Sequence, residues 1–388
     1  MRRLRTIPPR RLAAIIAAVA VLVATAGIAQ AGLIGSDPKP APKPLDRAIV
    51  DAFNAKAPAG VSARIEFTNG LLPSGAAPGG DPLLAGAEGR LWAAADGRMR
   101  LELQSDRGDA QIVADGERLS IYDAAAKTVY RLPIERSAAP AKPRGTTLAD
   151  VRRGLGQLTR AWTLSGAEPT STAGRPSYTL RIAPKDDGGL LGAGELAWDA
   201  ERGVPLRAAV YAQGDPEPVL ELEATDISFG GVSEAHLRSD VPKGTKVVEI
   251  EPPAHRPAGN DPHGAADVTG VNAVQRELDF DLSAPAELAG LPRKQVRLLR
   301  LDGRTGALAL YGEGLGGIAV LQHRSDTDRD GGALESTQLP QVNIDGATGT
   351  ELATALGTML TFERGGVRYT VLGSVPPVAA ENAARDLR

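Results

Sequence analysis

The sequence predicts a mainly β protein of the α+β class, in which a long antiparallel sheet precedes a smaller α+β unit. Three observations lead to this prediction. Apolar and polar residues alternate with a period of two over most of residues 60–250, as they do in strands with one buried face. Asp-Gly and other turn signals separate the alternating segments. The 388 residues include 45 Gly and 29 Pro, which suits many turns better than long helices.

The N-terminal segment predicts export. Residues 1–31 combine the arginine-rich "MRRLRTIPPRR", the uncharged "LAAIIAAVAVLVATAGI" and a small-residue end, "AQA", which together are typical of a secretory signal peptide. An uncleaved membrane anchor is the alternative, because Leu12–Ile34 is about as long as the ~20 residues of a membrane span. Residues 32–44 are Pro-rich and predict a semi-extended spacer. We therefore expect an extracytoplasmic protein, either secreted or tethered to the cytoplasmic membrane.

The cysteine content and the net charge exclude several kinds of modification and partner. The chain has no cysteine, which excludes disulfides and a lipid-modified N-terminal cysteine. Without residues 1–31 it carries 39 basic and 47 acidic residues, a net charge of −8. No polybasic segment remains, so we do not expect nucleic acid as a partner.

Two short helices are expected in residues 45–250. In Leu45–Ala57, the apolar residues Ile49, Val50 and Phe53 recur at helical spacing. A second helix within residues 146–162 begins at a threonine suited to cap its N-terminus. Its apolar stripe consists of Leu148, Val151, Leu155 and Leu158.

Eight to ten antiparallel strands are expected in the same region. The first group is "SARIEFTN", "RLWAAADGRMRLELQ", "AQIVADGERLSIYD" and "TVYRLPI", and the second is "SYTLRIAP", "GELAWDAERGVPLRAAVYA" and "PVLELEATDISF". Residues 251–267 are rich in Pro and Gly and predict a linker. Residues 268–388 then predict a small α+β domain with a helix at each end and about six strands between them.

No grouping of residues predicts catalysis, a cofactor or a metal site. The four histidines (His236, His255, His263 and His323) lack neighbours at ligand spacing. "YGEGLGGIAV" contains G-x-G-x-x-G, but a strand-like segment follows it where a dinucleotide site needs a helix. "DTDRDGG" begins like a calcium loop, yet Thr337 stands where that loop needs a glutamate. A hydrolase is therefore disfavoured.

The predicted sheet needs a partner for its apolar face, because such a face must be buried against something. Two helices, one of which contains two glycines, leave part of the face uncovered. A closed barrel, a second sheet from the same meander and a bound apolar ligand are the three alternatives. The predicted export of the protein and the small number of helices favour a bound apolar ligand.

The order of these segments resembles the superfamily of LolA-like lipoprotein carriers, mycobacterial lipid-binding lipoproteins and RseB-type regulators. The resemblance runs from "ARIEFTN" through "IVADGERLSIYDAAAKTVYRL" and "GELAWDAERGVPLRAAVY" to "VPKGTKVVEI", and covers residues 45–250. It implies an unclosed antiparallel β half-barrel with short helices in its mouth and an apolar inner face that holds acyl chains. The cavity residues implied in this way are Ile65, Phe67, Met99, Leu101, Leu103, Tyr130, Leu180, Ile182, Leu196 and Trp198. An error of one residue in a strand would turn its members to the other face.

The C-terminal region resembles a small domain of bacterial extracytoplasmic proteins, several of them linked to anti-sigma factors. The segments that carry this resemblance are "LYGEGLGGIAVLQ" and "LPQVNIDGATGTELATALGTMLTFERGGVRYTVLGSV". The resemblances imply a non-enzymatic protein that binds a lipid or a lipidated protein. The alternative that they imply is an RseB-like regulator that binds a membrane anti-sigma factor and senses the state of the envelope.

Overall fold

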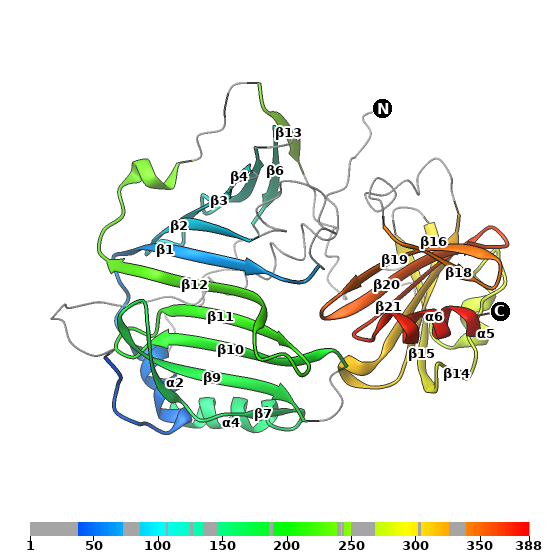
Figure 1. Cartoon of the computed structure of the whole chain (residues 1–388), viewed down its shortest axis with the longest axis horizontal. Coiled ribbons are helices and arrows are strands. Elements are labelled where there is room, and N and C mark those ends of the chain that lie inside the picture. The colour runs from blue at the N-terminus through cyan, green and yellow to red at the C-terminus, as the bar shows by residue number, and fades with distance from the viewer. Residues whose placement is uncertain are drawn as a thin grey trace, which may run out of the picture.

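In the computed structural model, the described residues form two mainly antiparallel sheets (Figure 1). The structure describes residues 38–72, 86–105, 108–124, 127–134, 146–185, 189–238, 242, 244–249, 268–301, 304–325 and 339–387. The predicted signal peptide, the first half of the predicted spacer, the predicted linker and the calcium-like loop lie outside these residues. Among the described residues, no helix has both the length and the apolar character needed to cross a membrane.

In the part of the chain that the structure describes, the first sheet has thirteen strands, in the order β13-β6-β5-β4-β3-β2-β1-β12-β11-β10-β9-β7, with β8 beside β9. Nearly every strand pairs with its neighbour in the sequence, as a meander does. The strands are β1 (Gly60–Asn69), β2 (Ala87–Ala94), β3 (Met99–Ser105), β4 (Gly108–Ala114), β5 (Arg118–Asp123), β6 (Thr128–Pro133), β7 (Trp162–Leu164), β8 (Glu168–Thr172), β9 (Arg175–Pro184), β10 (Leu191–Asp199), β11 (Pro205–Ala212), β12 (Pro218–Phe229) and β13 (Lys246–Glu249).

The predicted fold class is confirmed, with two corrections. The sheet has thirteen strands instead of eight to ten, because short edge strands such as β7 and β8 carry too few residues to show alternation. The sheet is also not wholly antiparallel, since β13 pairs with β6 in parallel, Val247 beside Val129. β13 returns from the far end of the meander, and its direction depends on that long connection instead of on its own sequence.

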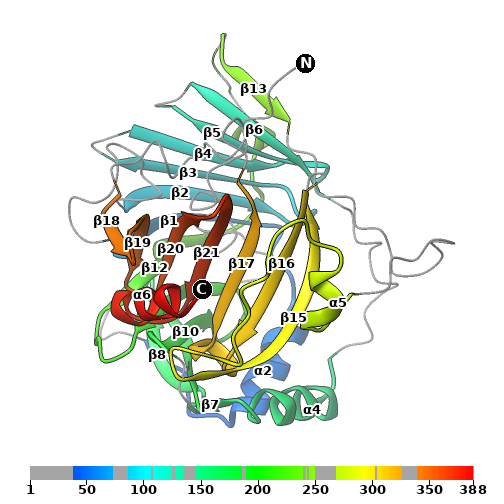
Figure 2. The ribbon, with the colours of Figure 1, turned by 90° about the vertical axis from the view of Figure 1, so that its right-hand side faces the viewer.

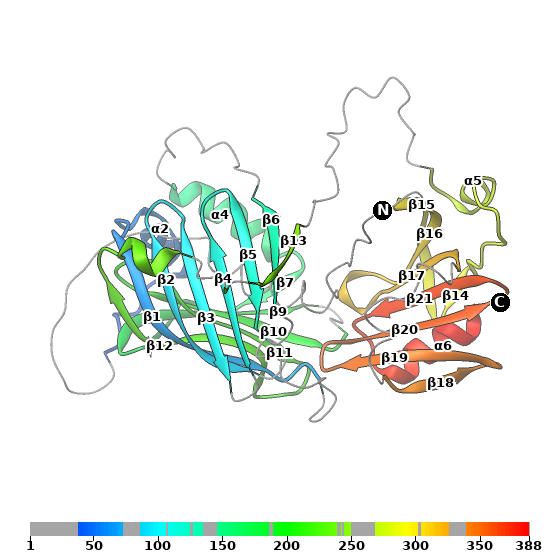
Figure 3. The ribbon, with the colours of Figure 1, turned by 90° about the horizontal axis from the view of Figure 1, so that it is seen from above.

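The first sheet curls into an unclosed half-barrel (Figures 1 and 3). Its inner face carries Ile65, Leu101 and Leu222, and its outer face carries Arg207 and Glu195. Period-two alternation produces this division: in β3, Met99, Leu101 and Leu103 are buried whereas the residues between them are partly exposed. The inner face thereby becomes continuously apolar across the strands.

Charged side chains cover part of the outer face. Glu195 of β10 accepts hydrogen bonds from Arg181 and Arg207, each at 2.7 Å, and from the Tyr211 hydroxyl at 2.9 Å. Burial opposes ionisation of this carboxyl, but these hydrogen bonds outweigh it and hold the pKa of Glu195 below its ordinary value. Arg207 also forms an ion pair with Glu221. This group of charges on the outer face is therefore paired within the sheet.

Two helices lie at the β9 end of the half-barrel (Figure 1): α2 (Leu45–Asn54) and α4 (Leu148–Leu158). The predicted N-terminal cap of α4 is confirmed, because Thr147 and Asp150 form a capping box. The helix predicted at α2 is present, and Ile49 and Val50 of its predicted stripe are partly buried, but Phe53 is 64% exposed. Ala48 and Ala52 pack toward β9 and β10 instead, because small side chains let the helix backbone come close to the sheet.

The second half of the predicted spacer contacts the sheet. The Tyr178 hydroxyl donates a hydrogen bond to the carbonyl of Ala41 at 2.7 Å, and Lys43 forms an isolated bridge with Ala167. Residues 38–44 therefore pack beside β9 and the start of β8 and lead directly into α2.

The described residues after position 267 form a second sheet of eight strands, in the order β14-β15-β16-β17-β21-β20-β19-β18. One face packs on the helix α6 (Figure 2), and the buried residues Val371, Leu360 and Ala380 belong to this core. The elements are α5 (Val271–Gln275), β14 (Glu287–Leu288), β15 (Leu291–Leu301), β16 (Arg304–Tyr311), β17 (Ile318–Arg324), β18 (Gln341–Ile344), β19 (Ala347–Thr354), β20 (Gly357–Arg364), β21 (Val367–Gly373) and α6 (Pro377–Asp386).

The two sheets touch through loops. The backbone N–H of Leu190 donates to the carbonyl of Ser374 at 3.0 Å, and that of Ala355 donates to the carbonyl of Leu71 at 2.9 Å. Each sheet has its own buried apolar cluster. We propose that residues 45–250 and 268–388 are separate folding units, as the sequence predicts.

Candidate functional site: an apolar cavity in the half-barrel

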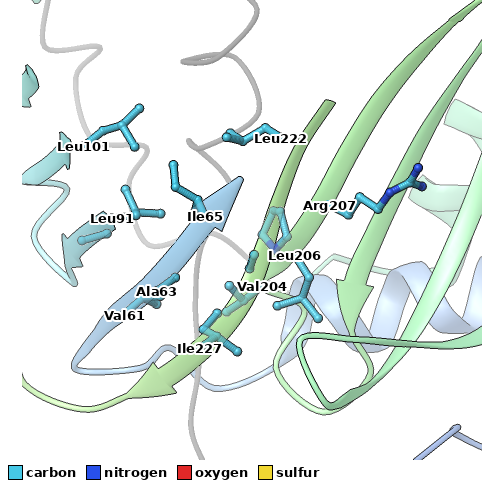
Figure 4. Close-up of a pocket in the computed structure, with 13 residues that line it drawn as sticks. Val61, Ala63, Ile65, Leu91, Leu101, Val204, Leu206, Arg207, Leu222 and Ile227 are labelled. Carbon is cyan, nitrogen blue, oxygen red and sulfur yellow. The ribbon is translucent and has the colours of Figure 1, made fainter. Parts of the chain in front are cut away.

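A cavity of about 50 Å³ lies on the inner face of the half-barrel (Figure 4). Of its thirteen lining residues, all but Arg207 are apolar, and the Arg207 side chain points away from the cavity. The lining therefore offers a surface for hydrocarbon and no ionisable group for acid–base chemistry. The apolar members are Val61, Ala63, Ile65, Leu91, Ala93, Leu101, Val204, Pro205, Leu206, Leu222, Ala224 and Ile227.

The curvature of the sheet creates this cavity. Leu101 of β3 and Leu206 of β11 both line it, although four strand spacings separate β3 from β11. In a flat sheet that separation would be about 19 Å, at ~4.8 Å per spacing. The cavity thus exists because the two halves of the meander curl toward each other around β1 and β12.

The cross-strand registers place the predicted cavity residues on one face. Leu101 is opposite Leu91, and Leu91 is opposite Ala63. A second row runs from Phe67 to Leu222 and continues through Ala208 to Leu196 and Leu180. Residues directly opposite each other point to the same side of a sheet.

The structure nevertheless divides the predicted set into three groups. Ile65 and Leu101 line the cavity. Phe67, Met99, Leu103 and Tyr130 belong to the same inner-face cluster without lining the cavity. Leu180, Ile182 and Trp198 pack in a different cluster with Ala48 of α2, and Leu196 is 36% exposed.

Helix α2 accounts for the third group. It covers the β9–β10 end of the inner face, where the Tyr178 and Trp198 rings lie 6.1 Å apart. The backbone of α2 lies very close to Gly203, where an added Cβ would be 2.3 Å from the Ala52 carbonyl oxygen. Helix α2 therefore occupies a part of the inner face that the sequence resemblance assigns to a ligand.

Most of the cavity lining was missed from the sequence. Leu91, Leu222 and Ala224 follow the same alternation as the residues that were chosen, so the pattern of β2 and β12 contains a signal for them. Val204 lies in the turn before β11, where no alternation of apolar and polar residues could indicate that it faces the cavity. Which alternating residues meet at one point depends on the curl of the sheet.

The other motifs carry no site in the described residues. After the glycines of "YGEGLGGIAV" the chain enters strand β17, so the prediction of a Gly-rich β connection is confirmed. His236 stacks on Trp92 at 5.0 Å, and His323 contacts the Arg324 carbonyl through Nδ1. His255 and His263 lie outside the described residues. Among the described residues, no group of three or more His, Asp or Glu side chains is placed to hold a metal ion.

Comparison with known proteins finds similarity among solved structures. No protein-family model and no curated protein matches the sequence. MucB in complex with MucA(peri) is similar at 16% identity and a TM-score of 0.42, over 89% of this chain and 97% of that one. The Pseudomonas aeruginosa MucA/MucB complex is similar at 15% identity and a TM-score of 0.41, over 87% and 95%.

A LolA superfamily protein from Nitrosomonas europaea is similar at 11% identity and a TM-score of 0.23, over 51% of this chain and 99% of that one. MucB and a LolA superfamily protein are thus among the solved structures to which this chain is similar. At such low identity the likeness concerns the fold alone.

Proposed function

We propose that this chain is an extracytoplasmic, non-enzymatic binding protein that holds an acyl chain of a lipid or a lipidated protein against the inner face of the half-barrel. The observation that carries the proposal is the cavity, whose lining is apolar except for a side chain that points away from it. The arginine-rich and then apolar N-terminal segment supports export.

Binding of a chain requires the half-barrel to open. A cavity of about 50 Å³ is smaller than the ~150 Å³ that accommodates benzene in an engineered apolar cavity. Inner-face side chains such as Leu101, which is 1% exposed, must therefore move. Each buried methylene contributes about 0.8 kcal/mol, so a long chain offsets the cost of this opening.

Filling the cavity tests the proposal. Ala93→Leu adds three carbon atoms to a lining residue. Because overpacking costs about 1–3 kcal/mol, we expect the affinity for dansyl-labelled undecanoic acid to fall about tenfold or more. Ala94→Leu is the matched control, because Ala94 is next to it in β2 and points to the outer face. Fluorescence titration of both variants provides the measurement. Equal affinities of the two variants for the labelled fatty acid would show that the cavity is not the binding site.

A regulatory role is the second candidate, favoured by the second sheet. An apolar row crosses five strands on the face opposite α6, and cross-strand register joins its members. At its centre, Leu372 of β21 is 53% exposed, whereas neighbouring Val371 is buried beneath α6. The row consists of Leu310, Ala319, Leu372, Met359 and Leu352. An uncovered apolar row is a surface that a protein partner can bury.

Leu372→Lys tests this candidate. We expect it to abolish binding to the extracytoplasmic part of the host's membrane anti-sigma factor, because a charge would replace an apolar contact at the centre of the row. Thr370→Lys, on the same strand and face, is the control and should retain binding. Surface plasmon resonance measures both affinities. Unchanged binding by the Leu372 variant would exclude this row as the interface.

A further inference from the structure

Arg202 is a buried cation whose role the fold does not explain. It lies in the turn between β10 and β11 and is 1% exposed. Among the described residues, its Nε and Nη1 atoms have no hydrogen-bond partner. Buried guanidinium groups are usually paired, since an unpaired one loses its hydration without compensation. Such a group is a candidate for recognition of an anion.

The two carboxylates that act electrostatically on Arg202, Asp199 and Glu201, already have other partners. Asp199 is fully buried, and its Oδ2 accepts from Arg175 Nε at 2.8 Å. Its Oδ1 accepts from the backbone N–H groups of Glu201 and Arg202 at 3.0 and 2.8 Å. Glu201 is largely exposed and faces Arg175 Nη2 at 3.4 Å. The turn is thereby held rigid, and the carboxylates bond Arg175 instead of the Arg202 side chain.

The local charges act on Arg202 in both directions. Burial lowers the pKa of its guanidinium and the positive charge of Arg175 adds to this effect, while Asp199 and Glu201 oppose it. An additional anion beside Arg202 would relieve the cost of burying this charge.

The Arg202 guanidinium stacks on Phe229, whose cross-strand partner Val61 lines one end of the apolar cavity. Its central carbon is 4.0 Å from the centroid of the Phe229 ring. Phe229 is opposite Val61 in the β1–β12 register, and Val61 lines the cavity. Val204, two residues after Arg202, lines it too, and Val61, Val204 and Ile227 lie together at that end (Figure 4). An amphiphile with its chain in the cavity would therefore place its polar end near Arg202.

We propose that Arg202 binds the anionic head group, a carboxylate or a phosphate, of the ligand whose hydrocarbon chain lies in the cavity. This inference rests on the proposed function and adds the chemical class of the ligand. A guanidinium forms two parallel hydrogen bonds with either group. In a buried setting such charge-assisted bonds are stronger than in water. The fold would then retain an unpaired Arg202 because the ligand supplies its partner.

The test compares ligands that share a chain and differ in the head group. Dodecanoate, dodecyl phosphate and dodecanol, each below its micelle concentration, displace the uncharged fluorescent probe N-phenyl-1-naphthylamine from the full-length exported protein. In the wild type we expect the two anions to bind about tenfold or more tightly than the alcohol, as expected of a charge-assisted contact. In Arg202→Met this preference should vanish while dodecanol affinity stays the same.

Each result decides between the two proposals. An anion preference that persists in Arg202→Met overturns the role of Arg202 and leaves the lipid-binding function standing. Failure of the probe and all three amphiphiles to bind the wild type overturns both. Inorganic phosphate that binds as tightly as dodecyl phosphate, and that Arg202→Met no longer binds, would assign the residue to a free anion instead of a head group.

A control separates recognition from folding. Methionine replaces the aliphatic part of the arginine side chain and removes an unpartnered buried charge, so the Tm of the free variant should equal or exceed that of the wild type. A lower Tm together with an unchanged anion preference would make Arg202 a structural residue. If Arg202→Met does not fold, Arg202→Lys is used, which keeps the charge but loses the planar fork and should reduce the preference only in part.

Discussion

Replacing Gly203 by alanine should destabilise the half-barrel by about 3 kcal/mol more than the same change at Gly174. Both glycines have left-handed backbones, with φ of +65° and +66°, so both variants share a cost of about 1–2 kcal/mol for that conformation. Only at Gly203 would the new Cβ meet helix backbone, 2.3 Å from the Ala52 carbonyl oxygen and 2.7 Å from its Cα. Backbone atoms of α2 cannot rotate away as a side chain can.

Urea denaturation of Gly203→Ala and Gly174→Ala measures this difference. Nothing lies within 4 Å of the position that a Cβ on Gly174 would take, which makes it a control for the backbone term alone. Equal losses in the two variants would mean that α2 shifts freely. In that case α2 would be a movable cover over Leu180 and Trp198.

The second large effect is expected from truncating one core at a time. Leu360→Ala in the second sheet and Leu101→Ala in the half-barrel each remove a side chain that is no more than 1% exposed. Each should cost about 2–5 kcal/mol through lost burial and a new cavity. Because the sheets touch through loops, calorimetry should resolve two transitions, and each variant should lower the Tm of only one.

Each of these two variants is the control for the other. A single transition that both variants shift together would contradict separate folding units. Two transitions that respond independently would support the proposed boundaries at residues 45–250 and 268–388, and would show that cavity variants can be studied without disturbing the second sheet.

Much of the fold could be predicted because alternation is a local property. In β3, the alternation within one strand is enough to predict that Leu101 is buried and Arg100 is partly exposed. The capping of α4 by Thr147 was equally local, since cap and partner are three residues apart. In α2 only Phe53 was placed wrongly, because its apolar character favoured burial, whereas Ala48 and Ala52 pack against the sheet. The residues through which α2 contacts the sheet depend on how closely the helix backbone approaches the strand backbone.

The sequence by itself determined the fold class, the faces of the main strands and the absence of cysteine chemistry. These features depend on residue types and on neighbours two to four positions apart. Only the tertiary structure decided which apolar residues surround the cavity, because the curl of the sheet brings β3 to β11. It alone also decided the burial of Arg202, which lies in the turn between β10 and β11. Its burial depends on Phe229, twenty-seven positions away along the chain and brought beside it by strand pairing.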